Sequence, residues 1–184
     1  MSEQALFGIK VRAGNWGVFA ACFSCREVQN LPMKLLDYLD TVSINLNISG
    51  TTKEDILSEL VNLLVKKGAI KDKDALINSL LEREGLGSTG IGHGVAIPHG
   101  RTEELEQPAI AFGRSEADVD FDAIDGQPTR LFFLLVAPEN GTTQHLHLLA
   151  KIARLMKDSE TREQLLKLDS AEAVVALLNE DATK

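Results

Sequence analysis

Apolar residues recur every three or four positions along two neighbouring segments, 52–68 and 72–85. In the first segment Thr51 or Thr52 can cap a helix whose apolar face comprises Ile56, Leu60, Leu63 and Leu64. In the second, Asp72 is the cap and Gly85 the stop, and the apolar face comprises Leu76, Ile77, Leu80 and Leu81. Because this spacing gathers apolar side chains on one side of a helix, both segments are predicted to be amphipathic helices.

The pattern changes between residues 95 and 138. A continuous apolar run at 131–137 is typical of a buried central strand, and 108–114 and 95–97 are shorter strand candidates. Helical spacing then returns in three segments, at 144–158, at 159–168 with Ser159 as cap, and up to Leu178 with Asp169 or Ser170 as cap. Helices on both sides of a small sheet are expected. The predicted fold class is α/β, a three-layer α/β/α arrangement with a small mixed sheet, which some schemes call α+β.

Composition limits the possible partners. The chain has 184 residues, a formal net charge of -8 and a pI near 5.0. Its Lys and Arg residues are scattered, so the sequence offers no basic face for nucleic acid or for an anionic membrane surface. No apolar run reaches the roughly 18 residues of a membrane span. We expect a cytoplasmic protein that neither binds nucleic acid nor inserts into a membrane.

The first 32 residues differ from the rest of the chain. They hold Cys22 and Cys25, but a second Cys-x-x-Cys pair and a strand-to-helix pattern are both missing, so zinc or redox chemistry is not indicated. Met33 follows directly, and regular patterning starts only after it. We predict that residues 1–32 are an N-terminal extension, either disordered or upstream of the native start, and that residues 33–184 form one domain.

The stretch "GLGSTGIGHGVAIPHG" at 85–100 concentrates glycines around two histidines. It lacks the lysine of a nucleotide P-loop, and Val95 stands where a dinucleotide fingerprint requires its third glycine. No Gly-x-Ser-x-Gly elbow and no acidic magnesium cluster occur elsewhere. His99 remains, at the end of a predicted strand between Pro98, which fixes the backbone on one side, and Gly100, which leaves the other side open. This histidine is expected to be accessible to a partner.

The motifs "REGLGSTGIGHGVAIPHGR", "FDAIDGQP" and "TQHLHLLAKIARLM" resemble the IIA proteins of the fructose/mannitol class of the bacterial phosphoenolpyruvate phosphotransferase system, including its nitrogen-regulatory branch. The resemblance covers residues 33 to 184. It implies that His99 accepts a phosphoryl group from the carrier HPr or its nitrogen-branch relative. It also implies that His145 and Arg83 stabilise that group. Many relatives carry asparagine at the position of His93, so no catalytic role is assigned to it.

The chemistry of imidazole supports the same roles. Neutral imidazole is a good nucleophile near pH 7, and the N–P bond that it forms retains enough transfer potential to pass the group on. Neither a metal nor a cofactor is expected, because the donor is itself a phosphohistidine. Aligned donors must stabilise the phosphoryl oxygens, and glycine N–H groups, Arg83 and His145 could supply them. His145 is expected at the start of a helix, with His147 about 200° away on the same helix and therefore outward.

Each assignment has a simpler alternative. Arg83 ends a helix, where an arginine can merely complement the helix dipole. Asp122 and Asp125 in "FDAIDGQP" are first of all turn residues and only second a partner contact. The four histidines of the chain lack the His-x-x-x-His spacing of a zinc site. Val95 and Ile97 are expected to give the surface around His99 a shallow, weakly charged patch for docking a protein.

Two functions remain open. In the first, phosphorylation of His99 is a switch, and the chain is a phosphotransferase component used mainly to regulate other proteins. In the second, the chain is a sugar-specific IIA component that passes phosphate to a IIB subunit. Because no IIB, IIC or carrier segment is fused to the chain, the regulatory function is favoured.

Overall fold

The computed structural model describes residues 34–181. Within them, six strands form one mixed sheet in the order β1-β5-β6-β3-β2, and β4 also pairs with β6. The strands are β1 (Ile44–Ile48), β2 (Gly90–Gly92), β3 (Val95–Ala96), β4 (His99–Thr102), β5 (Ala109–Val119) and β6 (Thr129–Pro138). β5 and β6 pair antiparallel, whereas β1 runs parallel to β5, and β3 and β4 run parallel to β6. The predicted small mixed sheet is confirmed.

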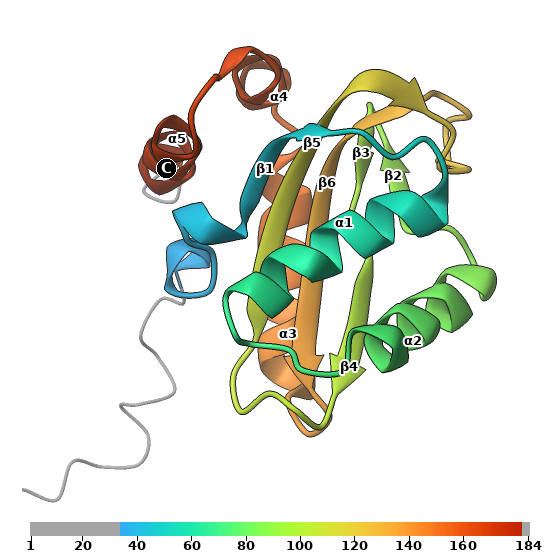
Figure 1. Ribbon diagram of the computed structural model, residues 1–184. Helices are drawn as coiled ribbons and strands as arrows, with labels where there is room; N and C mark the ends of the chain where they lie inside the picture. The colour runs from blue at the N-terminus through green and yellow to red at the C-terminus, as the bar shows by residue number, and fades with distance from the viewer. Residues whose placement is uncertain (1–33, 182–184) are drawn as a thin grey trace, which may run out of the picture. The chain divides into compact units, whose positions relative to one another are not determined.

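Five helices cover the two faces of the sheet, with α1 and α2 on one face and α3 on the other (Figure 1). The helices are α1 (Lys53–Lys66), α2 (Lys73–Gly85), α3 (Thr142–Leu155), α4 (Ser159–Lys167) and α5 (Ala171–Asp181). Short 3₁₀ turns, η2 (Leu35–Asp37) and η3 (Thr41–Ser43), precede β1. The three-layer α/β/α prediction is therefore correct for the described residues.

The apolar run at 131–137 lies in strand β6, between two helical layers. Phe132, Leu134 and Val136 belong to the core cluster under α1 and α2. Leu131, Phe133 and Leu135 belong to the second cluster, under α3, α4 and α5. Because a strand with helices on both faces buries successive side chains on opposite sides, alternation of apolar and polar residues is lost.

The helix starts follow the capping chemistry read from the sequence, with two exceptions. The Thr52 hydroxyl accepts the N–H of Asp55 and the Asp72 carboxylate accepts that of Ala75, as predicted. The cap of α4 is Asp158, one residue before the predicted Ser159, and its carboxylate accepts the N–H of Thr161. Helix α3 starts three residues before His145, from a glycine N-cap, so His145 lies within its first turn and not at its first position.

The glycine-rich stretch differs from the predicted single strand. It forms a short antiparallel hairpin of β2 and β3, and the strand path then breaks at Ile97 and Pro98 before β4 begins. Proline has no N–H to donate to β6, which accounts for the interruption. His99 therefore opens β4, whereas the sequence placed it at the end of a strand.

Two sequence predictions concern residues outside this range. The proposed N-terminal extension, 1–32, and its cysteines Cys22 and Cys25 lie outside the described residues.

None of the helices between residues 34 and 181 is long and apolar enough to span a lipid bilayer.

Candidate functional site

His99 is oriented by the backbone immediately before it. Its Nδ1 lies 2.9 Å from the carbonyl oxygen of Ile97. A carbonyl can only accept, so Nδ1 carries the proton and the lone pair of the neutral ring is on Nε2. The interruption at Pro98 thus produces a histidine that is half-buried, fixed in one tautomer, and equipped with one nucleophilic nitrogen.

The surroundings of His99 favour its neutral form. Burial lowers the pKa of His99 below its ordinary value, and the positive charge of Arg83 lowers it further. The Ile97 carbonyl and the Glu84 carboxylate oppose this shift, but the net direction is downward. A neutral imidazole near pH 7 is the nucleophilic form, so electrostatics and hydrogen bonding prepare the same nitrogen.

His145, in helix α3, packs against the ring of His99. The two ring centroids are 5.4 Å apart at an interplanar angle of 69°, an edge-on contact. The His145 residue is 6% exposed, and neither of its ring nitrogens has a hydrogen-bond partner among the described residues. Buried polar atoms without partners are rare and costly, so His145 has two ring nitrogens with unused hydrogen-bonding capacity beside His99.

His145 is also held neutral. Burial lowers its pKa to about 4, with smaller contributions in the same direction from His99 and from Arg101. An anion bound between the two rings would reverse the balance, because a nearby negative charge favours the protonated form. His145 can therefore change from a neutral ring into a charged donor when an anion arrives.

The start of α3 lacks the side chains that usually cap a helix. Its N-cap is Gly141, no side chain caps it, and no acidic residue lies in its first turn. Free N–H groups and the positive end of the helix dipole lie there, and both favour an anion. His145 projects from this turn towards His99, whereas His147 is exposed, as its position on the helix predicted.

Arg83 lies in helix α2, on the face of the sheet opposite to α3. It lies in the last turn of α2, and its Nη1 donates to the carbonyl oxygen of Gly87 at 3.1 Å. This bond holds the guanidinium over the loop that leads into β2. Its charge lowers the pKa of His99, so Arg83 lies close enough for its electric field to act on that ring. Both the predicted roles, partner of the helix end and part of the site, are compatible with this position.

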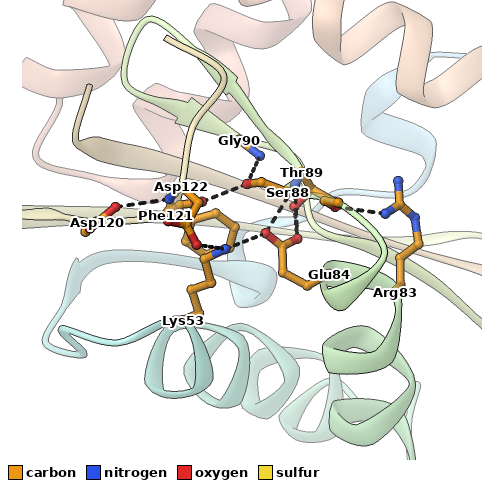
Figure 2. A network of polar contacts seen from close by, with 10 residues as sticks. Lys53, Arg83, Glu84, Ser88, Thr89, Gly90, Asp120, Phe121 and Asp122 are labelled. Carbon is orange, nitrogen blue, oxygen red and sulfur yellow. Dashed lines mark hydrogen bonds and ion pairs between the residues drawn. The ribbon is translucent and has the colours of Figure 1, made fainter. Parts of the chain in front are cut away.

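Glu84, next in sequence, lies at the centre of a polar cluster that the sequence did not reveal (Figure 2). Its carboxylate accepts the N–H of Thr89 at 3.0 Å and the Thr89 hydroxyl at 2.6 Å. Lys53 lies 3.0 Å from Glu84 and 2.9 Å from Asp122, and it covers the ring of Phe121 at 5.0 Å. Burial opposes the charge on Lys53, but the two carboxylates outweigh it and raise the pKa of Lys53.

This cluster is connected to His99 through the backbone. Glu84 fixes Thr89, and the carbonyl oxygen of Thr89 accepts the N–H of Ile97 at 3.0 Å. The carbonyl of Ile97 in turn accepts from Nδ1 of His99. Glu84 thus positions His99 through two intermediate residues.

The segment 120–128, which contains "FDAIDGQP", packs on the β2–β3 hairpin. A Cβ added to Gly90 would lie 2.7 Å from the Cα of Ala123, so only glycine permits this approach. Asp125 accepts the N–H of His93 at 2.7 Å and the N–H of Gln127 at 3.1 Å, and these bonds lower its pKa. Asp125 therefore combines the predicted turn chemistry with a clamp on the hairpin, and the exposed His93 occupies the turn.

The expected apolar patch is wrong in its residues. Val95 and Ile97 are buried beneath the site and not part of its surface. Exposed apolar side chains occur instead at Leu86, after α2, with 86%, at Ile91 of β2 with 37%, and at Leu146 of α3 with 59%. Strand alternation between two helical layers buries the residues of β3, while the turns remain outside.

Two residues missed by sequence reasoning bear on the site. Glu84 belongs to "EREG", where a buried carboxylate beside a glycine run could have indicated an internal partner. Arg101 follows His99 by two positions, and the two-residue period of a strand would have placed both on one face. Between residues 34 and 181, no three His, Cys, Asp or Glu side chains gather closely enough to hold a metal ion.

Comparison with known proteins shows the family of the chain. The family described as "Phosphoenolpyruvate-dependent sugar phosphotransferase system, EIIA 2" matches residues 37–181. A fructose-specific EIIABC component of Bacillus subtilis is 40% identical over 80% of the chain, which spans only 23% of that protein. A fructose-specific EIIA component of Haloferax volcanii is 39% identical, covering 74% of the chain and 89% of the relative. A nitrogen regulatory protein of Pseudomonas aeruginosa is 38% identical, covering 72% and 86%.

Solved structures share the fold. The nitrogen regulatory protein IIA-Ntr of Neisseria meningitidis is 39% identical and superposes with a TM-score of 0.73, covering 77% of this chain and 97% of that one. The mannitol IIA of Escherichia coli, in its complex with phosphorylated mannitol IIB, is 25% identical with a TM-score of 0.65, covering 77% and 97%. The chain therefore belongs to the EIIA 2 family of the phosphoenolpyruvate-dependent sugar phosphotransferase system.

Proposed function

We propose that this protein is a phosphohistidine carrier that takes a phosphoryl group on Nε2 of His99 and acts as a phosphorylation-dependent regulator. The observation that supports it best is the contact between two histidines of different character. His99 presents a lone pair, and the buried His145 beside it has no partner for either ring nitrogen. A phosphoryl group on His99 would supply the partner that His145 lacks.

The donor that fits is the phosphohistidine of an HPr-like carrier protein. The lone pair of Nε2 attacks phosphorus as the N–P bond to the carrier's imidazole breaks. The departing imidazole keeps the electron pair of the broken bond and takes up a proton from water. The ring of His99 keeps its Nδ1 proton and carries the positive charge that N–P bond formation leaves on it. Because the group in flight resembles metaphosphate, catalysis consists of alignment and of stabilising three oxygens.

We assign stabilisation of the phosphoryl oxygens to groups from both helical layers, α3 and α2. His145 and the open start of α3 approach from one side, and Arg83 acts on His99 from the other. Protonated His145 would donate to a phosphoryl oxygen with a charge-assisted hydrogen bond, and the arginine would act in the same way. We assign this activity to the segment 33–184, of which the family match covers residues 37–181.

The regulatory role follows from charge. A phosphoryl group adds roughly one and a half to two negative charges to the surface at His99. Leu86, after α2, and Leu146, next to His145 in α3, are exposed apolar side chains. A partner that buries this surface would be repelled, whereas a partner that offers cations would be attracted. Similarity to nitrogen regulatory proteins, at 38% and 39% identity, supports this use of the site.

The test of carrier function is uptake of phosphate. With phosphoenolpyruvate, enzyme I and a cognate carrier, intact-mass spectra should show one acid-labile phosphate on the wild type and none on His99→Ala. His93→Ala, which alters an exposed histidine in the turn of the β2–β3 hairpin that precedes His99, is the matched control and should be phosphorylated normally. Phosphate on His99→Ala would end the proposal.

The alternative function is that of a sugar component. It is favoured by the 39% identity to a fructose-specific EIIA component and by the likeness to a mannitol IIA that forms a complex with its IIB. Under the regulatory proposal, a non-transport protein should bind in a way that changes when His99 is phosphorylated. Formation of sugar phosphate that depends on His99, when a IIB subunit, its membrane partner and sugar are supplied, would instead establish the sugar component.

A further inference from the structure

We infer that Arg101 is a further phosphoryl-binding residue, which contacts the group on His99 from the side of α3, opposite to Arg83. This inference rests on the proposed function, because it assigns a third side chain to the same phosphoryl group. Arg101 is the last residue of the glycine-rich motif "REGLGSTGIGHGVAIPHGR", but neither that motif nor the histidine pair gives it a role. Its position follows from strand β4 alone.

The first step concerns the face of β4. A Cβ added to Gly100 would lie 2.9 Å from Cδ2 of Leu80, so position 100 faces helix α2. Neighbours along a strand point to opposite sides, and His99 and Arg101 therefore both face the layer of α3. The ring contact between His99 and His145 of α3 is independent evidence for this direction. Two positions along one face are about 6.6 Å apart, which an arginine side chain can reach across.

The second step places the guanidinium of Arg101 near the start of α3. Its Nη1 donates to the carbonyl oxygen of Glu139, in the short connection between β6 and α3. The N–H of Glu139 donates to Thr102 of β4, which fixes this connection beside the strand. The open N-terminus of α3, with Gly141 as its cap, follows two residues later. Arg101, the helix start and His145 therefore lie around one point.

The third step is electrostatic. The charge of Arg101 contributes to the lowered pKa of His145, whereas the charge of Arg83 contributes to the lowered pKa of His99. Each histidine of the pair thus has its own arginine, one from β4 and one from α2. An anion between the two rings would feel both guanidinium groups, an arrangement that suits a phosphoryl group with nearly two negative charges shared by three oxygens.

The fourth step is that Arg101 is available for this contact. Its bond to Glu139 measures 3.4 Å, longer than the usual 2.7 to 3.2 Å or so of an N–H···O bond, and it is exposed to water. Exchanging such a bond for a charge-assisted bond to a phosphoryl oxygen is favourable. A purely structural arginine is bonded differently. Arg114 donates to the carbonyls of Leu46 and of three residues at the end of α4.

The experiment compares phosphoryl transfer in four proteins: wild type, Arg101→Gln, Arg101→Lys and the control Arg130→Gln. Arg130 is a half-buried arginine of β6 that donates to the Ser115 carbonyl at 3.2 Å. Rapid quench and intact-mass detection give the rate of uptake from the phosphorylated carrier. We expect Arg101→Gln to be slower by about tenfold or more, Arg101→Lys to recover part of the loss, and Arg130→Gln to match the wild type. An uptake rate of folded Arg101→Gln within twofold of wild type would overturn the inference.

A second measurement uses the unaltered protein and does not depend on how any variant folds. In wild type labelled with ¹⁵N-arginine, the Nε–H resonance of Arg101 should shift on phosphorylation of His99, and that of Arg130 should not. An unmoved Arg101 resonance would contradict the inference. The two proposals fail separately. If wild type gains no phosphate on His99, the proposed function is wrong. If it gains phosphate normally while Arg101 is silent in both measurements, only the role of Arg101 is wrong.

Discussion

Glu84 in α2 and His145 in α3 are two buried polar side chains on opposite faces of the sheet near His99, and they differ in their hydrogen bonding. Glu84, 9% exposed, has a full set of partners in Lys53 and Thr89. His145, 6% exposed, has none for either nitrogen. Satisfied buried groups stabilise a fold, whereas an unsatisfied group in an otherwise well-packed site requires another explanation.

This difference indicates that the α2 side, with Glu84, supports the structure of the site, whereas the α3 side, with His145, takes part in the proposed reaction. The Glu84 cluster ties α2, α1 and the segment 120–128 to the hairpin before His99, as Figure 2 shows, and every bond in it is already made. On the His145 side two ring nitrogens have no partner, and under the proposed function the phosphoryl group on His99 supplies one. Substitutions on the two sides should therefore act on different properties, stability on one and phosphoryl transfer on the other.

The largest expected effect is on acid stability. An unfolded histidine has a pKa of about 6.5, and in the folded protein burial lowers that of His145 to about 4. The unfolded chain therefore binds a proton that the folded protein refuses, and stability is lost as the pH falls from 6.5 towards 4. Relative to His145→Gln, wild type should lose on the order of 3 kcal/mol across this range. Urea unfolding at pH 7 and pH 4 measures the difference.

The exposed histidine of the same helix is the control for that experiment. His147→Gln should keep the acid sensitivity of wild type, because His147 is exposed. Equal pH dependence in wild type and His145→Gln would show that His145 is not held neutral in the fold.

The next effect concerns transfer. His145→Ala should still be phosphorylated on His99, but about a hundredfold more slowly, since one donor to the phosphoryl oxygens is lost. His147→Ala should behave as wild type. Quenched-flow uptake from the phosphorylated carrier measures both rates. A larger defect in His147→Ala would mean that the wrong face of α3 was assigned to the site.

The smallest expected effect is that of a substitution at Glu84, whose hydrogen bonds are already made. Glu84→Gln keeps the shape of the side chain but removes the charge that Lys53 and Thr89 share, and we expect a loss of about 2 kcal/mol in the free energy of unfolding. Transfer should slow only modestly, because Glu84 acts on His99 through Thr89 and Ile97. Glu82→Gln, on an exposed position of the same helix, should change neither property. Normal stability in Glu84→Gln together with abolished transfer would reverse the assignment of the two layers.

The helices could be predicted from the sequence because their signals are local. Thr52 and Asp72 cap α1 and α2 as their spacing indicated, and the all-apolar run of β6 correctly predicted a strand buried on both faces. β2 and β4 could not be predicted in this way. They consist largely of glycine, histidine and polar residues, and they are strands because β3 and β6 pair with them, which is a tertiary effect.

The residues of the site also separate into those with local sequence signals and those placed by tertiary contacts. The motif around His99 and the helical position of His145 could be read from the sequence, and the structure brings these two side chains into contact. Lys53 and Glu84 are 31 positions apart, and no local pattern relates them. Arg101 was missed because β4 was missed, since its place beside His99 depends on strand alternation.

The titration of His145 before and after phosphorylation tests the central claim most directly, that this buried ring awaits the phosphoryl group on His99. Histidine-labelled protein followed by ¹⁵N NMR should show a pKa of about 4 for His145 in the unmodified state. After phosphorylation the pKa should rise by at least about two units, because a protonated ring would then donate to the anion. A His145 pKa that stays unchanged when His99 carries phosphate would contradict the account.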